Sequence, residues 1–466
     1  MHYQRGVPRE QTALLPARVE DYVATDHPVR VIDAFVNRLD AGTLGFRHAR
    51  LQTTGRPPYD PRDLLKLFVW GYLNRVRSTR GLEREAGRNL EVLWLLGGLR
   101  PDFKTLANFR RNDGDAISKV CREFVQFCRG LNLFGSLLVA IDGTKLQAVA
   151  STKAVWTPER LAAAQAALVA STQQYLQELA ESEQSDGGDS DCARVREALA
   201  ALSRRAEQLG RIEPHLQEQK QHVATEPEAK RMRVAGKGKP VAYNVQTAVD
   251  SLHGLIAAHE VTNDSNDRQQ LLPTALLAKE ALQVDTLQVI ADAGYHNAEH
   301  AHGCNESGIV AAVPMQASAS SEEGLFPKAR FDYQPSDDSY RCPAGQVLRR
   351  YKIDRKKGTS YYQTKACGDC PLKPQCTKAT LRSISRERHA AAAEAAAERF
   401  TADLRRQRRC LAEHPFGTLK WLMPRFLLRG LAGARTETSL AVTAYNLKRS
   451  IRLLGVHALI ANLQPG

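Results

Sequence analysis

The chain has 466 residues, of which 43% are hydrophobic and 25% are charged. This is the composition of an ordinary globular protein, and it excludes a disordered, a collagen-like and a disulfide-scaffold chain. The length predicts two to four domains of roughly 100 to 200 residues each. No apolar run approaches the roughly 20 residues that a bilayer-spanning helix needs, and the polar sequence after Met1 does not resemble a signal peptide. We therefore expect a cytoplasmic protein with no membrane partner.

The chain is strongly basic. It has 65 Lys and Arg side chains against 51 Asp and Glu, which leaves a formal net charge of +14. Such a surplus favours a polyanionic partner, because a basic protein that binds nucleic acid releases condensed counterions. The basic residues are concentrated between Arg382 and Arg409. We therefore expect nucleic acid as the partner, and an association with the nucleoid.

The sequence predicts an all-helical domain over residues 1–130. Asp60 followed by Pro61 is typical of a helix start, and the apolar residues after them repeat with a helical period. Two further helices are expected over residues 81–96 and 105–111.

The third of these helices is short and basic, since it carries Arg110 and Arg111. It either enters a groove of DNA, as in a helix-turn-helix, or belongs to a packing domain with a solvated basic face. Under the first interpretation the domain recognises DNA, and Arg110 and Arg111 contact it.

Residues 131–152 and 236–316 are expected to form parts of a mixed α/β core. Residues 136–141 are a short apolar run that ends at Asp142, as in a buried strand that runs into a turn. Strands that are linked by helices are expected to be parallel. The elements expected in the second part are a hairpin over 243–250 and 255–261, a helix over 270–282, a strand over 286–291, a helix over 298–306 and a strand over 309–313.

Residues 153–235 differ in composition and predict an antiparallel helical hairpin inserted into this core. Thr157 and Pro158 are typical of a helix start, and Leu161, Leu168 and Tyr175 follow at intervals of seven. A second apolar stripe follows a polar turn. Core packing without further function is the favoured interpretation of this hairpin.

Residues 317–385 interrupt the α/β pattern with turn residues and four of the nine cysteines. Cys342, Cys367, Cys370 and Cys376 form a C-x24-C-x2-C-x5-C array. Four thiolates can satisfy a tetrahedral structural Zn²⁺, and a segment with few apolar residues gains its fold from such an ion. The alternative is a set of reduced thiols without a metal. The remaining residues, 386–466, predict a helix over 390–411 and further helices that complete the core.

Asp142 and Asp292 each follow an apolar strand and precede small residues. In open α/β sheets, sites form at such strand ends. Crowded carboxylates at a poorly solvated edge repel each other, and a divalent cation relieves that repulsion. Mg²⁺ prefers oxygen ligands, and two ions can promote in-line phosphoryl transfer. Glu413 is the candidate third acid, although a plain Arg409–Glu413 pair on one helix face is the alternative.

Four blocks carry a resemblance to a known family: Asp142-Gly143-Thr144-Lys145, Tyr243-Asn244-Val245-Gln246-Thr247-Ala248-Val249-Asp250, Asp292-Ala293-Gly294-Tyr295 and Glu413-His414-Pro415-Phe416-Gly417. In this order they resemble the blocks of bacterial insertion-sequence DDE transposases with a ribonuclease H-like core. Gly55-Arg56-Pro57-Pro58-Tyr59-Asp60 resembles the helical domain that precedes the core in one subgroup.

The resemblance implies that Asp142, Asp292 and Glu413 hold Mg²⁺ or Mn²⁺. It also implies Arg409 and Lys420 as phosphate contacts, from a Tyr-x2-Arg-x3-Glu-x6-Lys signature whose tyrosine position holds Arg406 here. Arginine can hold a phosphate but cannot stack as a phenol ring does. Together with Lys145, these side chains are the candidate DNA contacts of the core.

The function that follows is a transposase that binds terminal inverted repeats, cleaves DNA and joins the freed end to target DNA. A homodimer is expected, since two DNA ends must be brought together. The alternative is a transposase-derived DNA-binding protein without catalytic activity. A haloacid-dehalogenase-like phosphatase is excluded, because Ala140 stands where its nucleophilic carboxylate would be.

Overall fold

The structure is a computed structural model that describes residues 18–50, 57–184, 189–234, 236, 238–316 and 324–463. Gly55 and Arg56 of the N-terminal motif lie outside the described residues. The chain divides into two compact units. The first holds the described residues up to Leu133, together with Trp421–Met423 and the chain from Arg435 onward, and the second holds Phe134–Lys420 and Pro424–Ala434.

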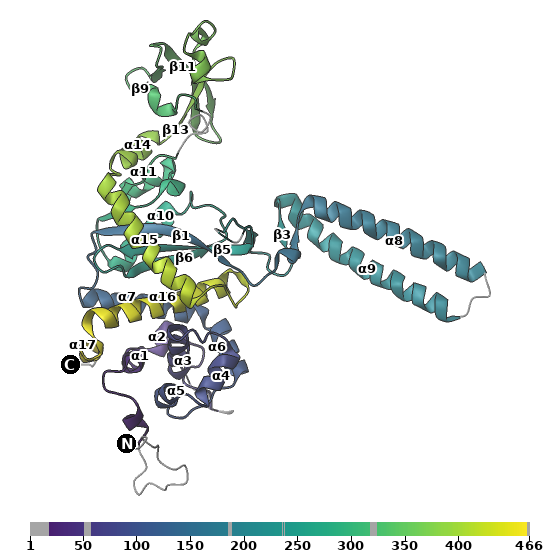
Figure 1. The fold of residues 1–466 in the computed structure, drawn as a ribbon, viewed down its shortest axis with the longest axis vertical. Helices are drawn as coiled ribbons and strands as arrows, with labels where there is room; N and C mark the ends of the chain where they lie inside the picture. Colours follow the sequence, from purple (N-terminus) through teal and green to yellow (C-terminus); the bar gives the residue numbers. More distant parts are fainter. Residues whose placement is uncertain are drawn as a thin grey trace, which may run out of the picture. The chain divides into compact units, whose positions relative to one another are not determined.

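The described part of the first unit is helical, as the sequence predicts (Figure 1). Asp60 caps the start of its third helix by accepting a hydrogen bond from the backbone N–H of Arg62. Its helices are α1 (Pro28–Asn37), α2 (Ala41–Leu44), α3 (Pro61–Leu73), α4 (Thr79–Ala86), α5 (Leu90–Leu95), α6 (Phe103–Asn112), α7 (Gly114–Gly130), most of α16 (Gly430–Leu454) and α17 (Val456–Leu463), with a 3-10 turn η1 (Val19–Tyr22).

The helix expected over residues 81–96 is two helices in the structure. Helix α4 ends before Gly87, and α5 begins after Asn89, whose side chain accepts hydrogen bonds from the backbone N–H groups of Glu91 and Val92. An apolar period runs through such a break unchanged, because both helices bury the same stripe.

The C-terminal helices require a correction. All of residues 386–466 were expected to belong to the catalytic core, whereas the chain from Arg435 onward belongs to the unit of the N-terminal helices. Glu437 of α16 shows the reason. Its side chain is 0% exposed, and it lies 3.3 Å from Arg77 Nη1 and 3.3 Å from the hydroxyl of Tyr72. A buried carboxylate needs such partners, and the N-terminal helices supply them.

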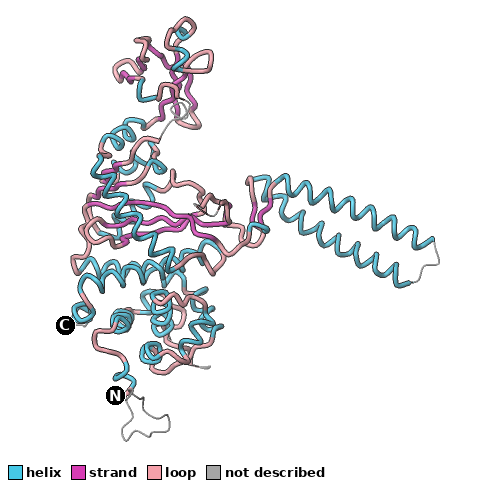
Figure 2. Tube along the Cα trace, in the orientation of Figure 1, coloured by secondary structure: helices cyan, strands magenta, loops and turns pink. Residues whose placement is uncertain are grey.

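The second unit is built on a mixed six-stranded sheet (Figure 2). Along the sheet the order is β4, β5, β1, β7, β8, and β6 also pairs with β5. The β1–β5 and β5–β6 pairs are antiparallel, and the β1–β7 and β7–β8 pairs are parallel. The strands are β1 (Leu138–Gln147), β4 (Lys230–Arg231), β5 (Val241–Asp250), β6 (Ile256–Thr262), β7 (Leu287–Ile290) and β8 (Ile309–Ala312). The predicted hairpin and the predicted parallel strands are confirmed.

Helices link and cover these strands. Ala140, Ile290 and Ala312 form a buried cluster, and Phe400, Leu404 and Leu411 from the C-terminal part of the chain pack on it. The helix expected over residues 390–411 is therefore divided, so that its second half can lie on this face. The helices are α10 (Leu271–Leu282), η3 (Ala293–Tyr295), α11 (Ala298–Glu306), α14 (Ala390–Glu398) and α15 (Ala402–Leu422).

The two helices predicted between residues 153 and 235 are present as α8 (Pro158–Gln184) and α9 (Asp189–Glu218), which pack on each other as a hairpin (Figure 1). Two short antiparallel strands stand at its base, β2 (Val155–Trp156) and β3 (His222–Val223), next to a 3-10 turn η2 (Thr152–Ala154). A cluster of Trp156, Leu161, Leu209, Ile212 and Leu216 is buried there. The base of the hairpin is thus held by its own apolar core.

The cysteine-containing segment is more ordered than its sequence predicts. It forms an antiparallel sheet in the order β13, β12, β11, β10, β9, with its own core of Phe331, Tyr340, Leu348, Tyr362 and Ile384. The sequence suggested that this segment gains its fold from a metal ion. The structure shows that an apolar core also holds the segment together. The elements are η4 (Lys328–Arg330), β9 (Asp332–Gln334), β10 (Ser339–Arg341), β11 (Val347–Asp354), β12 (Thr359–Gln363), η5 (Lys365–Cys367), α13 (Lys373–Cys376) and β13 (Ser383–Glu387).

Within the part of the chain that the structure describes, no helix combines the length and the apolar character that crossing a membrane requires.

Candidate active site

Asp142 lies in β1, and Asp292 lies just after the neighbouring parallel strand β7, at an equivalent position along the chain. The last residue pair of the β1–β7 ladder is Ala140 with Ile290. Asp142 follows two residues after the first of these, and Asp292 two residues after the second. Because parallel strands advance in step, both carboxyl groups come to the same level of the sheet.

The position of Asp142 differs from the one expected at the end of a strand. Strand β1 continues through Asp142 to Gln147, since β5 pairs with it along this whole length and Asp142 lies opposite Thr247. Only the pairing with β7 stops at Ala140. The apolar run therefore ends at Ile141 because β1 no longer pairs with β7 beyond this point, although the strand itself continues.

A single arginine bridges the two aspartates. Arg408 Nη2 lies 2.8 Å from Asp142 Oδ1 and 3.1 Å from Asp292 Oδ2. Side chains alternate along a strand, so Asp142 shares the face of Ala140, on which Leu404 and Leu411 of α15 pack. Arg408 lies between these two leucines at helical spacing and therefore points to the same face.

Burial changes the acidity of Asp142. The side chain is 18% exposed, and loss of solvation raises its pKa to about 6, although Arg408 acts in the opposite direction. The negative charge of Asp292 raises the pKa further. The site therefore disfavours two ionised carboxylates, even beside one guanidinium.

Asp292 is the more exposed of the pair, and it has a local structural role. One of its oxygens accepts a hydrogen bond of 2.8 Å from the backbone N–H of Gly294 and so caps the 3-10 turn η3. The other oxygen contacts Arg408. The same residue therefore fixes the turn after β7 and takes part in the acidic pair.

A polar network that the sequence did not reveal supports the strand behind Asp142. Asp267 accepts hydrogen bonds from Asn244 at 2.7 Å and Gln246 at 2.8 Å, and it pairs with Lys145 at 3.0 Å. Tyr295 donates its hydroxyl hydrogen to Gln246. The blocks around residues 243–250 and 292–295 were the available signal, but only the fold brings Asp267 to them.

Gly143 is required by this network. A Cβ atom at this position would lie 2.4 Å from Gln246 Nε2, 2.6 Å from Asp267 Oδ1 and 3.1 Å from the hydroxyl of Tyr295. These distances are too short for a side chain. The glycine after Asp142 therefore lets the network approach the backbone of β1.

The structure does not bring Glu413 into contact with the two aspartates. It is exposed on α15, five residues after Arg408, and its side chain makes no ion pair or hydrogen bond with any described residue. A helix rises about 1.5 Å per residue, so the two positions are about 8 Å apart along the axis. At about 100° per residue, they also point in different directions.

The candidate DNA contacts have different environments. Arg110 is 5% exposed, lies over the ring of Phe68 and donates a hydrogen bond to the carbonyl oxygen of Arg77. Its prediction as a DNA contact is corrected, because an inward-facing arginine that packs in the helical core cannot reach a phosphate. Arg111, on the same helix, is exposed and donates to Asn108.

The candidate DNA contacts of the second unit also differ in their environments. Lys145 is engaged by Asp267, at 19% exposure, and Arg406 pairs with Asp403. Arg409 and Lys420 are exposed on α15, and neither forms an ion pair with another described residue. These two can therefore meet a partner without breaking such a pair.

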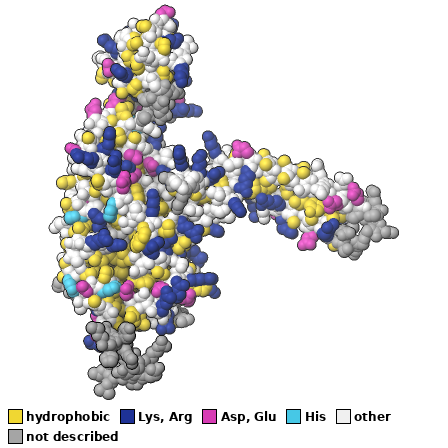
Figure 3. Space-filling model, viewed as in Figure 1, with side chains coloured by type: hydrophobic (Ala, Val, Ile, Leu, Met, Phe, Trp, Pro, Cys, Tyr) yellow, Lys and Arg dark blue, Asp and Glu magenta, His cyan; other side chains and the backbone are white. Residues whose placement is uncertain are grey.

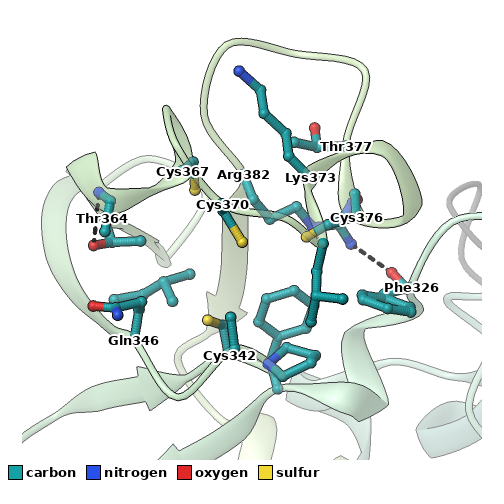
Figure 4. Close-up of a pocket in the computed structure, with 16 residues that line it drawn as sticks. Phe326, Cys342, Gln346, Thr364, Cys367, Cys370, Lys373, Cys376, Thr377 and Arg382 are labelled. Carbon is teal, nitrogen blue, oxygen red and sulfur yellow. Dashed lines mark hydrogen bonds between the residues drawn. The ribbon is translucent and has the colours of Figure 1, made fainter.

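The four predicted cysteines line one pocket in the cysteine-containing segment (Figure 4). Burial raises the pKa of Cys376, nearby Arg382 lowers it, and Cys367, Cys342 and Cys370 raise it. Arg382 is held beside them by donating to the carbonyl oxygens of Cys376 and Phe326. Among the described residues, however, no three His, Cys, Asp or Glu side chains are grouped as a ready metal site.

The fold and the site define a class: a mixed α/β protein in which an acidic side chain of β1 and one just after the parallel neighbour β7 converge on the guanidinium of Arg408. Two family models then give the family. Residues 17–112 match a transposase domain (DUF772), and residues 341–451 match a transposase DDE domain. Together the two matches support an insertion-sequence DDE transposase, a class of enzyme for which DNA binding and cleavage are generally implied.

A solved structure titled as the cryo-EM structure of a piggyBac transposase synaptic complex with hairpin DNA is similar to this chain. The identity is 9%, the match covers 94% of this chain and 78% of the other, and the TM-score is 0.34. At this TM-score the likeness carries no weight for the arrangement of the site. No curated protein matches the chain.

Proposed function

We propose that the chain cleaves the ends of its element and joins them to target DNA at a centre formed by Asp142, Asp292 and Glu413 in a ribonuclease H-like core. One observation carries this proposal: oxygens of Asp142 and Asp292 contact the same nitrogen atom, Arg408 Nη2. Two carboxylate oxygens that converge on a single positive centre are the arrangement that a bound divalent cation requires.

The donor chemistry suits Mg²⁺ or Mn²⁺. Both ions prefer oxygen ligands, and Mg²⁺ typically takes one or two carboxylates together with substrate phosphates. When bound, such ions activate the attacking oxygen and stabilise the leaving oxygen of an in-line displacement. Asp142 and Asp292 would hold the ions, and Glu413 would complete one shell.

The protein's own contribution is position and charge. The polar network around Asp267 and the close approach at Gly143 fix the backbone on which Asp142 stands. The turn capped by Asp292 fixes the second carboxylate. Phosphoryl transfer needs no protein nucleophile, so rigid placement of these acids is the larger part of catalysis.

Glu413 reaches the centre only if α15 adjusts. Pro415, two residues later, lies inside this helix. A proline inside a helix has no N–H to donate to the carbonyl four residues before it, and its ring crowds that carbonyl. We propose that this weakened turn lets Glu413 approach Asp142 and Asp292 when DNA and metal bind.

DNA binding involves both units in this proposal. Arg409 and Lys420 contact phosphates near the cleavage centre, and Arg406 joins them if it leaves Asp403. The N-terminal helical domain, with Arg111 exposed on α6, recognises the terminal inverted repeats. A homodimer holds two ends, and the protein associates with the nucleoid in the cytoplasm.

A cleavage assay tests the proposal. The substrate is DNA that carries the terminal inverted repeats of the element, with Mg²⁺. We expect Asp142→Asn, Asp292→Asn and Glu413→Gln each to reduce cleavage by more than roughly 100-fold, the loss that follows even from changing residues that only support a ligand. Binding of the ends should remain, and Asp332→Asn, at an exposed site on β9, should cleave normally.

Two results would contradict the proposal. Full cleavage by Asp142→Asn would remove the metal assignment. Specific binding of the ends without cleavage by the natural chain, under conditions in which a known transposase cleaves its own ends, would instead favour a transposase-derived binding protein.

We also propose that Cys342, Cys367, Cys370 and Cys376 hold a structural Zn²⁺. Their support is the shared pocket, the chemistry of four thiols and the positive Arg382 beside them, which favours thiolates. The chain purified without chelators should contain one zinc per chain by elemental analysis. Cys367→Ser with Cys370→Ser should lose it, and Cys410→Ser, an exposed cysteine outside the pocket, should keep it. A zinc-free natural chain would end this assignment.

A further inference from the structure

Arg408 does not belong to the residues that the family signature selects, yet it lies at the centre of the acidic pair. The signature points to Arg409, which is exposed on the next position of the helix. Arg408 is 19% exposed, and its Nη2 contacts both Asp142 and Asp292. The position to which a divalent cation would bind is therefore filled by a side chain of the protein itself.

Within the described part of the chain, the polar contacts of the guanidinium are with Asp142 and Asp292. Its Nε is buried and has no hydrogen-bond partner among the described atoms. A guanidinium in a permanent structural ion pair usually uses several of its five donors, often two on one carboxylate. In Arg408 a single nitrogen, Nη2, contacts both carboxylates. This is the geometry of a counter-ion, and it leaves few other contacts that would hold the guanidinium in place.

We propose that Arg408 is a built-in counter-ion that assembles the Asp142–Asp292 pair in the metal-free protein and leaves when a divalent cation binds. The inference rests on the proposed function of this pair as a metal site. Arg408 acts through the two aspartates and is a positioning residue.

Electrostatics requires an exchange of this kind. Without a positive charge the two carboxylates repel each other, and this repulsion favours their separation. A cation that binds the same two oxygens at about 2 Å excludes a nitrogen atom at hydrogen-bond distance from them. Metal and guanidinium therefore compete for one place, and the affinity for metal is lower than the carboxylates alone would give.

The test compares Arg408→Gln with the natural chain, without DNA, in two measurements. The thermal midpoint is recorded in EDTA and in saturating Mn²⁺, and the affinity for Mn²⁺ is measured by calorimetry. We expect Arg408→Gln to melt lower in EDTA, to recover most of that difference in Mn²⁺, and to bind Mn²⁺ at least about 10-fold more tightly, since a competing charge near 4 Å is removed.

Two further variants separate this role from simple packing. Arg408→Lys keeps a positive charge and should restore the thermal midpoint in EDTA and the weaker Mn²⁺ affinity. Arg405→Gln, at an exposed position on the same helix, should match the natural chain in both measurements.

The outcomes distinguish the inference from the proposed function. If neither the natural chain nor Arg408→Gln binds Mn²⁺, the metal site itself is wrong, and the inference is wrong with it. If the natural chain binds Mn²⁺ and Arg408→Gln shows the same affinity with an equal thermal loss in EDTA and in Mn²⁺, the metal site stands and the counter-ion role is refuted.

Discussion

Asp142 is buried more deeply than Asp292: the side chain of Asp142 is 18% exposed, and that of Asp292 is 47% exposed. Asp142 is ionised only against the cost of desolvation, which Arg408 offsets incompletely. Ionised Asp142 therefore destabilises the folded chain at neutral pH when no cation is bound.

This imbalance gives a pH-dependent prediction for Asp142→Asn in EDTA. The pKa is about 6 in the folded chain against an ordinary value of 3.8. Because the folded pKa is the higher one, stability from Asp142 is complete below about pH 4 and is lost as the pH rises to about 6. The full loss is about 3 kcal/mol.

Chemical denaturation at pH 4 and pH 8 checks it. Relative to the natural chain, Asp142→Asn should gain up to about 3 kcal/mol in free energy of unfolding between the two pH values, because asparagine does not titrate. A difference in free energy of unfolding that stays constant with pH would show that the pKa of Asp142 is not raised in the folded chain.

A second residue-scale prediction concerns Gly143. An alanine at this position would press on Gln246 and Asp267, so Gly143→Ala should lose about 1 to 3 kcal/mol of stability and impair cleavage. Gly210→Ala is the matched control, since no atom lies within 4 Å of its added Cβ and alanine favours the helix α9. Thermal unfolding of both variants measures these stabilities. Equal stability of Gly143→Ala and the natural chain would show that a Cβ atom at this position does not press on Gln246 and Asp267.

At this scale the sequence singled out Asp142 and Asp292 as candidates, because each follows a short apolar run. It did not distinguish Arg408 from its neighbour Arg409. That choice depends on the rotation of α15, which is set by Leu404 and Leu411 against Ala140 on the sheet. Similarly, Arg110 was expected on a basic surface, whereas its side chain packs over Phe68.

At the scale of elements, Glu226 ties three segments of the second unit together. The side chain is 1% exposed and accepts hydrogen bonds from Ala150 N–H at 2.9 Å, Tyr243 hydroxyl at 3.1 Å and Gly430 N–H at 3.1 Å. These groups belong to the chain after β1, to β5 and to the start of α16. One carboxylate thus fixes the sheet to the segment that follows α15.

Glu226→Ala should therefore lose about 3 kcal/mol or more in free energy of unfolding, because it leaves three donors unpaired, two of them on the backbone. Glu228→Ala, at an exposed residue that accepts from Leu431 N–H, should lose about 1 kcal/mol or less. Urea denaturation measures both, and similar small losses would show that the three segments are held together by other contacts.

Element types were easier to predict than element breaks. The hairpin of β5 and β6 followed from alternation, whereas the breaks between α4 and α5 and between α14 and α15 did not, because an apolar stripe continues across them. The sheet from β9 to β13 was missed for a different reason. Its core consists mainly of tyrosines and phenylalanine scattered among turn residues, so the segment is short of aliphatic residues although it has a core.

At the scale of the whole molecule, the excess positive charge is not confined to α15. Lys and Arg side chains gather along the α8–α9 hairpin in the space-filling view (Figure 3). Arg196, Arg204 and Arg211 are exposed on α9. The sequence favoured packing alone for this hairpin, but its apolar core is confined to a few residues that include Trp156 and Leu209.

We expect the triple variant Arg196→Gln, Arg204→Gln, Arg211→Gln to bind DNA more weakly and with a smaller salt dependence. The slope of log affinity against log salt should decrease in magnitude by roughly 0.9 for each phosphate that the variant no longer neutralises. Glu207→Gln on the same helix should not weaken binding. Fluorescence anisotropy across salt concentrations checks this. An unchanged slope would show that these arginines do not contact DNA and would leave packing as the role of the hairpin.

The central claim, that Asp142 and Asp292 share a cation site, is tested most directly by a crystal structure grown with Mn²⁺ and measured for anomalous scattering. We expect an anomalous peak within about 2 Å of an oxygen of each aspartate, with Arg408 moved away from both. Well-ordered aspartates that still bind Arg408 at saturating Mn²⁺, with no peak between them, would contradict it.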